Sequence, residues 1–284
     1  MKKYIEKCPV CSNAIFNKTG MILPEGELLS CNTCTQLLSQ CSEDRYFKSM
    51  EDFNVEQGTL ANNEKTLKRA YRLHSKRLEK CVNLINKKKD DLKLLDVGCS
   101  SGSFLKSAKE YGLTNISGVE PAEKAAQTAI NNGFHVDIGF LEDINLKENS
   151  YDIVTLFEVI EHLKEPHSLL NECHRILDKN GILLISTGNT NSWTVEMVKE
   201  KWDYFDINQN GGHISFYNIN SFKKLAKETH FEIVYFSTAN LSFYKKNDVS
   251  IIKYRFFKIL SEILKPLCSK MHKGHDILVF LRKK

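Results

Sequence analysis

Two patterns of apolar residues alternate along most of this chain. Runs typical of short strands occur at 92–97, 115–119, 134–138, 151–156, 231–237 and 275–282. Segments with apolar residues every three or four positions, typical of amphipathic helices, occur at 64–89, 103–111, 121–132 and 218–230. This alternation of strands and helices predicts an α/β fold with a doubly wound, mostly parallel sheet.

The N-terminal region lacks this alternation and is rich in cysteine instead. Cys8 and Cys11 form one C-x-x-C pair, and Cys31 and Cys34 form a second pair after nineteen residues. Two such pairs can close a tetrahedral four-thiolate zinc site, and zinc would supply folding free energy to a segment with few apolar residues. Two disulfides, or free buried thiols, are the alternatives. Cys41 is expected to be a buried small side chain.

The patterns suggest three parts. We expect a small zinc-ribbon module at 1–46, a linker and N-terminal helix at 47–90, and a catalytic domain at 91–284. The polar stretch before residue 64 is interpreted as a linker that packs on the next domain through isolated aromatic side chains.

The first strand of the predicted sheet leads into a candidate ligand loop. Asp96 ends the strand, and Gly98 and Gly102 bracket a turn before a helix, so the backbone can bend sharply and pack closely. The G-x-G-x-x-G order that cradles a pyrophosphate is missing, and Asp96 suggests a ligand with an ammonium group. Glu120 ends the second strand, 22 residues after Gly98, near the separation at which an acidic residue meets ribose hydroxyls. Phe140 follows the third strand, where an adenine could stack on it.

These segments resemble successive motifs of class I S-adenosylmethionine methyltransferases. The motifs are Asp96-Val97-Gly98-Cys99-x-x-Gly102, Gly118-Val119-Glu120, Tyr151-Asp152-Ile153-Val154-x-x-x-Glu158-Val159-Ile160-Glu161-His162-Leu163, and Arg175-Ile176-Leu177 with Gly181–Thr187 as a fifth strand. The resemblance spans roughly 64–240 and is nearest to ubiquinone O-methyltransferase-like enzymes and zinc-ribbon methyltransferases of polysaccharide and secondary-metabolite pathways. Ser100 departs from the glycine found in many members. The resemblance implies a seven-stranded Rossmann-like sheet whose last strand is antiparallel.

The resemblance also implies how S-adenosylmethionine would bind. Asp96 would lie near the methionine amino group and Glu120, followed by Pro121, on the ribose. Adenine would contact Phe140 and Leu141, and the methionine end would lie beside Phe157 and Glu158. Gly98, Cys99 and Gly102 would form the loop beneath the cofactor. A dinucleotide-binding Rossmann domain is the alternative.

Two histidines are candidates for the base that an acceptor hydroxyl would need. His162 follows Glu161 beyond the fourth strand, and relatives of the ubiquinone type use a similar cluster, matched by Glu158, Glu161 and His162, to support catalysis and in some cases a divalent metal. His213 follows paired glycines after the fifth strand. Either histidine could instead be structural.

The acceptor is less constrained by the sequence. The loop at about 188–217 combines asparagine and aromatic residues, which suits a sugar or lid packing equally. An extension at about 240–275 interleaves apolar and basic residues, and residues 245–284 contain 11 Lys or Arg and 3 Asp or Glu. This extension could be a basic amphipathic helix that binds anionic lipid or a phosphate-bearing acceptor. We favour the alternative, in which it is an accessory helix that packs on the domain or on a second subunit.

We therefore predict a methyltransferase acting on a small-molecule or glycan acceptor, such as a hydroxyl of a sugar or lipid-linked glycan precursor. An RNA methyltransferase, with the basic tail on phosphates, and a non-catalytic interaction protein are the alternatives. The chain has no segment that reads as a signal peptide or a membrane span. We expect a cytoplasmic protein, or one at the inner face of the membrane.

Overall fold

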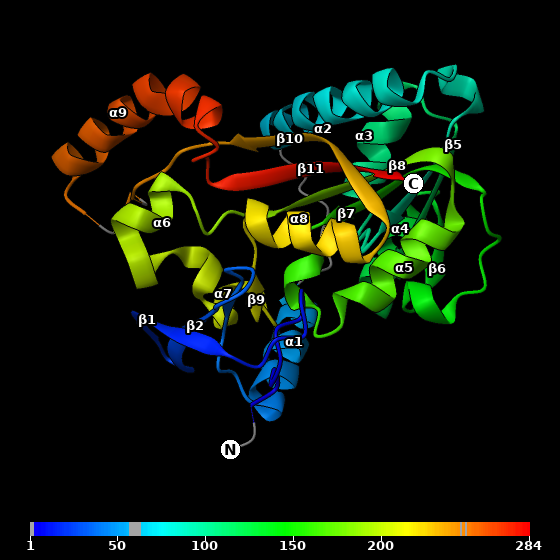
Figure 1. Cartoon of the computed structure of the whole chain (residues 1–284). Helices are drawn as coiled ribbons and strands as arrows, with labels where there is room; N and C mark the ends of the chain where they lie inside the picture. Colours follow the sequence, from blue (N-terminus) through cyan, green and yellow to red (C-terminus); the bar gives the residue numbers. More distant parts are fainter. Residues whose placement is uncertain (1–2, 57–63, 245, 248) are drawn as a thin grey trace.

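The central element is a mixed seven-stranded sheet (Figure 1). The computed structural model describes residues 3–56, 64–244, 246–247 and 249–284, with side chains described outside 52–66. The strand order is β10-β11-β8-β7-β4-β5-β6. Strands β4 to β8 are parallel, and β11 is antiparallel to both β8 and β10, as the family resemblance implied.

The elements follow the predicted alternation closely. The strands of the large sheet are β4 (Lys93–Val97), β5 (Asn115–Glu120), β6 (His135–Ile138), β7 (Tyr151–Phe157), β8 (Leu177–Gly188), β10 (Phe231–Ala239) and β11 (Asp276–Lys283). The helices associated with it are α2 (Glu64–Ile85), α3 (Ser103–Tyr111), α4 (Glu123–Asn131), α5 (Pro166–Ile176) and α8 (Ile219–Glu228). The predicted helix at 64–89 therefore ends four residues early, at Ile85.

Successive side chains in the strands point to opposite faces, so the sheet has two cores. Leu94 packs with α2, α3 and α4 on one face. Leu95 packs with α5 and α8 on the other face. Because both faces are covered, the parallel strands are apolar throughout, which is why they appeared as uninterrupted runs in the sequence.

The turn between β4 and α3 uses left-handed backbone conformations. Gly98 has φ of +74° and Gly102 has φ of +84°, and Ser100 adopts φ of +47°, a conformation that glycine takes more readily. A Cβ on Gly102 would meet Phe134 at 3.0 Å and Ala129 at 3.2 Å, which confirms the close packing expected there. A Cβ on Gly98 would meet Val159 Cγ2 at 2.5 Å. The side chain of Val159 therefore occupies the space that a Cβ at Gly98 would need.

A second, small sheet joins the N-terminal module to the catalytic domain. This sheet has the order β1-β2-β3-β9. Its first three strands come from the module: β1 (Phe16–Leu23), β2 (Gly26–Cys31) and β3 (Leu37–Leu38). The fourth, β9 (Ser215–Phe216), lies in the segment after His213. Leu37 pairs with Phe216, and Leu38 pairs with Ser215. The module is thus hydrogen-bonded into the predicted acceptor-loop region.

The first half of the predicted linker before residue 64 is helical and packs on the catalytic domain through Tyr46, whose hydroxyl donates to the carbonyl of His162. Residues Glu43–Glu56 form helix α1, which packs on α7 (Ile207–Asn210). A Cβ on Gly212 would lie 2.9 Å from Cε2 of Tyr46 and 2.4 Å from Sδ of Met50, so these α1 side chains fill the space beside this glycine. The remaining linker residues, 57–63, and the side chain of Phe53 lie outside the described residues.

The C-terminal extension forms helix α9 (Ile251–Lys270), which lies at the upper left in Figure 1. Helix α6 (Trp193–Val198) lies nearby. Among the described residues, no helix combines the length and apolar character needed to cross a bilayer.

Candidate active site and metal centres

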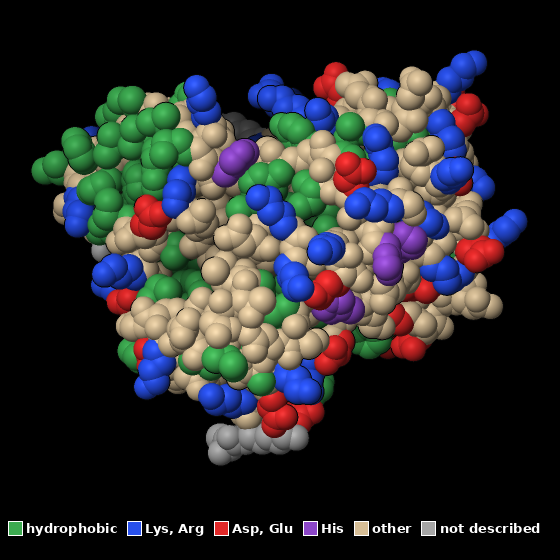
Figure 2. Space-filling model, in the orientation of Figure 1, with side chains coloured by type: hydrophobic (Ala, Val, Ile, Leu, Met, Phe, Trp, Pro, Cys, Tyr) green, Lys and Arg blue, Asp and Glu red, His purple; other side chains and the backbone are tan. Residues whose placement is uncertain are grey.

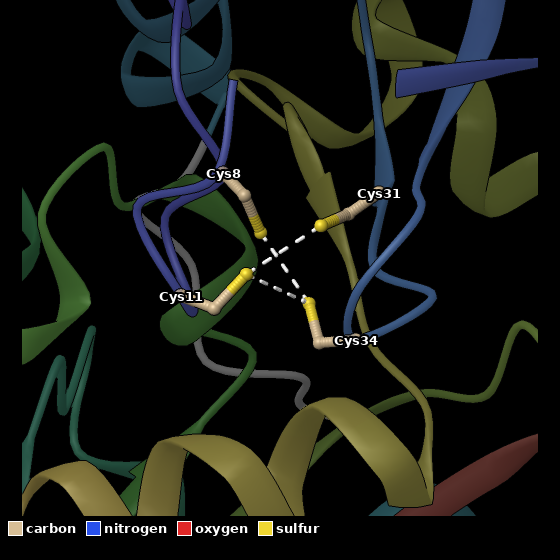
Figure 3. A group of neighbouring side chains, drawn as sticks. All are labelled: Cys8, Cys11, Cys31 and Cys34. Atoms are coloured by element: carbon tan, nitrogen blue, oxygen red, sulfur yellow. Dashed lines mark hydrogen bonds between the residues drawn. The ribbon is translucent and has the colours of Figure 1, made fainter. Parts of the chain in front are cut away.

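The four cysteines of the N-terminal module converge on one point (Figure 3). Sγ of Cys8 lies 3.5 Å from Sγ of Cys34, and Sγ of Cys11 lies 3.5 Å from Cys31 and 3.6 Å from Cys34. A disulfide needs sulfurs roughly 2.05 Å apart, whereas tetrahedral Zn–S bonds of roughly 2.3 Å put sulfurs roughly 3.8 Å apart. All nine cysteines lie in the described part of the chain, and none forms a disulfide. The arrangement fits a closed, structural Zn²⁺ site.

The cysteine cluster is part of a core shared with the catalytic domain. Cys8, Cys31 and Cys34 pack in the same apolar cluster as Tyr217 and Phe222 of the β9–α8 region. Cys41 is buried elsewhere, as expected, and its Sγ donates to the carbonyl of Ser42. A metal bound here would therefore stabilise the segment that follows His213 as well as the module.

The candidate cofactor site lies at the carboxyl ends of β4 and β5. Asp96 is buried and accepts a 2.6 Å hydrogen bond from Oγ1 of Thr155. Glu120 is buried and accepts from the backbone amides of Ser100 and Ala122, both at 2.8 Å. Burial raises the pKa of Asp96 to about 7 despite the Thr155 hydrogen bond, and burial also raises the pKa of Glu120. Two buried carboxylates with raised pKa values suit a ligand that carries positive charge and donates hydrogen bonds.

The other predicted cofactor residues of this region lie in the loops that follow β4, β5 and β6. Phe140 is 62% exposed, so its ring is free to stack, whereas Leu141 beside it is buried. Pro121 is exposed directly after β5. Cys99 is buried, and its Sγ fills the space where a Cβ on Gly118 would lie, at 2.5 Å. Cys99 therefore fixes the loop against β5.

Phe157 lies in an aromatic group that the sequence did not predict. His74 of α2 stacks parallel to Phe157 at 6.1 Å between ring centroids, and Phe104 contacts it edge-on at 4.7 Å. The guanidinium of Arg77 lies 4.9 Å from the Phe157 ring centre and donates to Oγ of Ser186. Helix α2 thus covers the carboxyl end of β7, and the half-buried Arg77 places a positive charge near Glu158.

A buried tyrosine lies between the two acidic residues after β7. The hydroxyl of Tyr204 contacts the carboxylates of both Glu158 and Glu161, and Oγ1 of Thr187 lies 3.1 Å from it. Glu158 adopts φ of +56°, a strained conformation for this residue type. Desolvation, followed by repulsion from Glu161, raises the pKa of Glu158 well above its ordinary range. One hydroxyl proton cannot serve two carboxylates, so the group needs an added proton or cation.

Glu161, His162 and His213 form a second candidate metal group. Their ligand atoms lie within 4.8 Å of one another, and the His162 and His213 rings are 4.7 Å apart. Nδ1 of His213 lies 3.0 Å from the carbonyl of Tyr204, so it carries the proton and leaves Nε2 unprotonated, 3.6 Å from Glu161. Burial lowers the pKa of His162 to about 4 and that of His213 well below its ordinary range.

This group meets the chemical requirements of a divalent cation. Two neutral imidazoles and one carboxylate form a familiar ligand set, and Oε2 of Glu161 has no hydrogen-bond partner among the described residues. Of the predicted set of Glu158, Glu161 and His162, the structure groups Glu161 and His162 with His213, which the sequence had not placed in this set. Glu158 is held instead by Tyr204.

Two residues of the site were not assigned a role from the sequence. Tyr204 appeared only as one of several aromatic residues in the acceptor loop, and Arg77 lies on a helix remote in sequence from every motif. Paired glycines before His213 were the one local indication of close packing, and both have positive φ, +41° and +66°.

A cavity of about 1020 Å³ lies beside this site. Trp202 lines it and stacks on Tyr204 at 4.9 Å, so the Trp202–Tyr204 pair separates the cavity from Glu158 and Glu161. Its lining combines aromatic, acidic and amide side chains, including Phe205, Phe243, Tyr244, Asp203, Asp206, Asn208 and Gln209. The turn between β1 and β2 and the N-terminal end of α9 also contribute to its wall.

Comparisons with known proteins agree with the motifs. Residues 65–235, more than half of the chain, match the family described as methyltransferase domain. The ubiquinone biosynthesis O-methyltransferase of Haemophilus ducreyi is 34% identical over 108 residues, which cover 34% of this chain and 45% of that protein. The chain spans less than half the length of these curated relatives.

Solved structures support the fold. An S-adenosylmethionine-dependent methyltransferase from Archaeoglobus fulgidus superposes with a TM-score of 0.53 at 19% identity, covering 75% of this chain and 94% of that one. Another from Thermotoga maritima has a TM-score of 0.52 at 19% identity and covers 83% of this chain and all of that one. The chain belongs to the methyltransferase-domain family, and its fold is that of the class I S-adenosylmethionine-dependent methyltransferases.

Proposed function

We propose that this protein transfers the methyl group of S-adenosylmethionine to a hydroxyl of a small-molecule or glycan acceptor. The main support is the buried pair of Asp96 and Glu120 at adjacent strand ends, which suits the ammonium and ribose groups of this cofactor. The similarity to an enzyme named as an O-methyltransferase favours oxygen as the acceptor atom.

Methyl transfer from a sulfonium mainly requires alignment, because the leaving group is good. The acceptor hydroxyl must also lose its proton, and a histidine can take it. Burial keeps His162 and His213 neutral at physiological pH and, by lowering their pKa values, also makes them weak bases unless acceptor binding raises those values. His162 is half-buried and His213 is buried, so His162 is the more accessible of the two. If Glu161, His162 and His213 instead held a divalent cation, the cation would increase the acidity of a nearby hydroxyl, and these histidines would act as ligands in place of the base.

Tyr204 has a positioning role in this proposal. Its hydroxyl fixes Glu158 and Glu161, and its backbone carbonyl accepts from Nδ1 of His213. One residue therefore sets the orientation of both acids and the tautomer of the histidine. Its ring, stacked on Trp202, also forms the boundary with the neighbouring cavity.

The cavity favours a polar acceptor with faces that can stack. Aromatic rings beside carboxylates and amides are typical of sites that bind sugars, since a pyranose has both apolar faces and hydroxyl edges. Lys199, Lys201 and Lys253 also line the cavity and would suit an acceptor that carries phosphate.

The proposal can be tested with cofactor labelled in its methyl group. Purified protein is incubated with this cofactor and with separated glycan, lipid, metabolite and RNA fractions of a cell extract. We expect label in a glycan, lipid-linked glycan or metabolite fraction, in a product heavier by one methylene and stable to ribonuclease. Ribonuclease-sensitive label would instead support RNA methylation, and failure to bind the cofactor would support a non-catalytic role.

A further inference from the structure

Helix α9 presents a continuous apolar stripe to solvent. Ile252 is 80% exposed, Phe256 60%, Ile259 63% and Ile263 69%, and Leu267 continues the stripe at 48%. These residues are spaced by four, three, four and four positions, so they lie on one side of the helix. The space-filling view shows this apolar surface at the upper left, over α9 (Figure 2).

The opposite side of α9 is firmly packed. Cys268 is buried and clusters with Leu241 and Phe243, and Phe257 and Leu264 pack against this cluster. The helix is therefore held in one orientation with its stripe outward. A contiguous apolar surface of this kind on a folded protein marks a binding site for another apolar surface.

The charges around the stripe identify its partner. Helix α9 contains five basic residues and one acidic residue, Glu262, a net charge of 5 − 1 = +4. The whole chain carries +5, so only +1 remains elsewhere. The basic residues are Lys253, Arg255, Lys258, Lys265 and Lys270. Pairing two copies through this helix would bring two sets of positive charge together, whereas an anionic bilayer offers both acyl chains and negative headgroups.

We propose that α9 binds the surface of an anionic lipid bilayer, lying in the plane of the membrane with its stripe among the acyl chains. The stripe from Ile252 to Leu267 is roughly 22 Å long at 1.5 Å per residue. Lys253 and Arg255 lie on either side of the stripe, and their charged ends can extend to the headgroups while their stems remain on the apolar side. This binding is peripheral.

The binding surface lies next to the cavity described above. Tyr244, Val249 and Lys253 line the cavity at the N-terminal end of α9, and the Lys253 ammonium lies 4.7 Å from the Tyr244 ring centre. A membrane-bound α9 would therefore hold the cavity beside the bilayer. This inference rests on the proposed function and narrows its acceptor class to a glycan or small molecule that is anchored to lipid.

Vesicle sedimentation tests the proposal directly. The full chain, without cofactor, is mixed with vesicles of phosphatidylglycerol and phosphatidylcholine, or of phosphatidylcholine alone. We expect binding to the anionic vesicles that weakens as salt rises, because the headgroup attraction is screened. The double variant Ile259→Asp/Ile263→Asp should bind roughly ten-fold or more weakly, since it removes two apolar side chains that the bilayer would bury. Arg255→Glu/Lys270→Glu, which reverses charges beside the stripe and in line with it, should also lose most of the binding to anionic vesicles.

Ile22→Asp is the matched control, because Ile22 is an equally exposed apolar residue, at 64%, that lies outside α9, on β1 of the small sheet. This variant should sediment with anionic vesicles as the wild type does, and circular dichroism should show that all variants are folded. Wild-type protein that stays in solution with anionic vesicles would overturn the proposal. So would a wild-type dimer, seen by sedimentation velocity, that the stripe variant converts to a monomer. The assay needs no methyl transfer, so its outcome is independent of the proposed reaction.

Discussion

The side-chain amide of Gln36 donates a 2.7 Å hydrogen bond from Nε2 to Oγ of Ser215, and both residues are completely buried. Gln36 lies two residues after the last cysteine of the zinc ribbon, and Ser215 lies two residues after His213. Ser39 N also donates to Ile214 O at 2.9 Å, and Asn218 Nδ2 donates to Thr35 O at 2.9 Å. The ribbon and the candidate histidine loop are thus joined by buried hydrogen bonds.

Breaking this connection should affect both stability and turnover. Gln36→Met removes the amide donor while keeping most of the side-chain volume. The buried Oγ of Ser215 then loses this hydrogen bond. We expect a loss of roughly 1–3 kcal/mol in unfolding free energy, measured with denaturant, and a lower turnover with near-normal cofactor affinity. Unchanged stability together with unchanged turnover would show that the connection is unimportant.

The cysteine cluster should hold one equivalent of zinc in protein purified without added metal. Cys34→Ser should lose this zinc, as measured by elemental analysis, and should lower the melting temperature. Cys41→Ser is the control, because Cys41 is equally buried but lies outside the cluster. If Cys34→Ser retained a full equivalent, the assigned ligand set would be wrong.

Cofactor binding should depend on pH through Asp96. The pKa of Asp96 in the folded protein is raised to about 7 from 3.8 by burial, so the carboxylate needed for the cofactor ammonium forms only near neutral pH. Calorimetry should show affinity that falls as pH drops below about 7. Asp96→Asn should bind roughly ten-fold or more weakly, with little pH dependence. Glu120→Ala should weaken binding similarly, and wild-type affinity in both variants would reject the site.

Asp96 should also lower the stability of the cofactor-free protein. A carboxyl whose pKa is raised on folding favours the folded state below its unfolded pKa of 3.8, and that contribution is lost as pH rises to about 7. Above pH 7 the cost is constant, roughly 4 kcal/mol at most. Asp96→Asn avoids this cost and should unfold at higher denaturant concentration than the wild type at pH 8. A less stable variant would contradict this account.

Tyr204→Phe tests the positioning of the two acids. Loss of the hydroxyl leaves Glu158 and Glu161 without their shared donor, so turnover should fall roughly 10- to 100-fold while cofactor affinity changes little. Tyr151→Phe is the control, since its hydroxyl lies at the other end of β7, 3.4 Å from Oγ of Ser117. Equal single-turnover rates for the two variants would remove Tyr204 from the mechanism.

His162→Ala or His213→Ala should identify the base. Removing a general base typically lowers the rate roughly 10²–10⁴-fold, and cofactor affinity should survive because neither histidine is in the predicted cofactor site. Near-normal single-turnover rates in both variants, with acceptor bound, would show that neither histidine is the base.

The sequence alone predicted the elements whose information is local. The C-x-x-C pairs, the strand-loop-helix around Asp96 and the Glu120 strand end each lie within a few residues, so spacing and periodicity were sufficient. Helix α1 was missed because its sequence is mostly polar and its packing partner, α7, is some 150 residues away.

Tertiary structure decided which of these parts meet. No periodicity relates Gln36 to Ser215, or Tyr204 to Glu158 and Glu161, because each contact joins segments separated by tens to hundreds of residues. The position of His213 beside Glu161 and His162 depends on the turn at Gly211 and Gly212 and on its packing against α1. Contacts between residues far apart in the sequence depend on how the two sheets and α1 pack together. That packing is a property of the folded chain and not of any one segment.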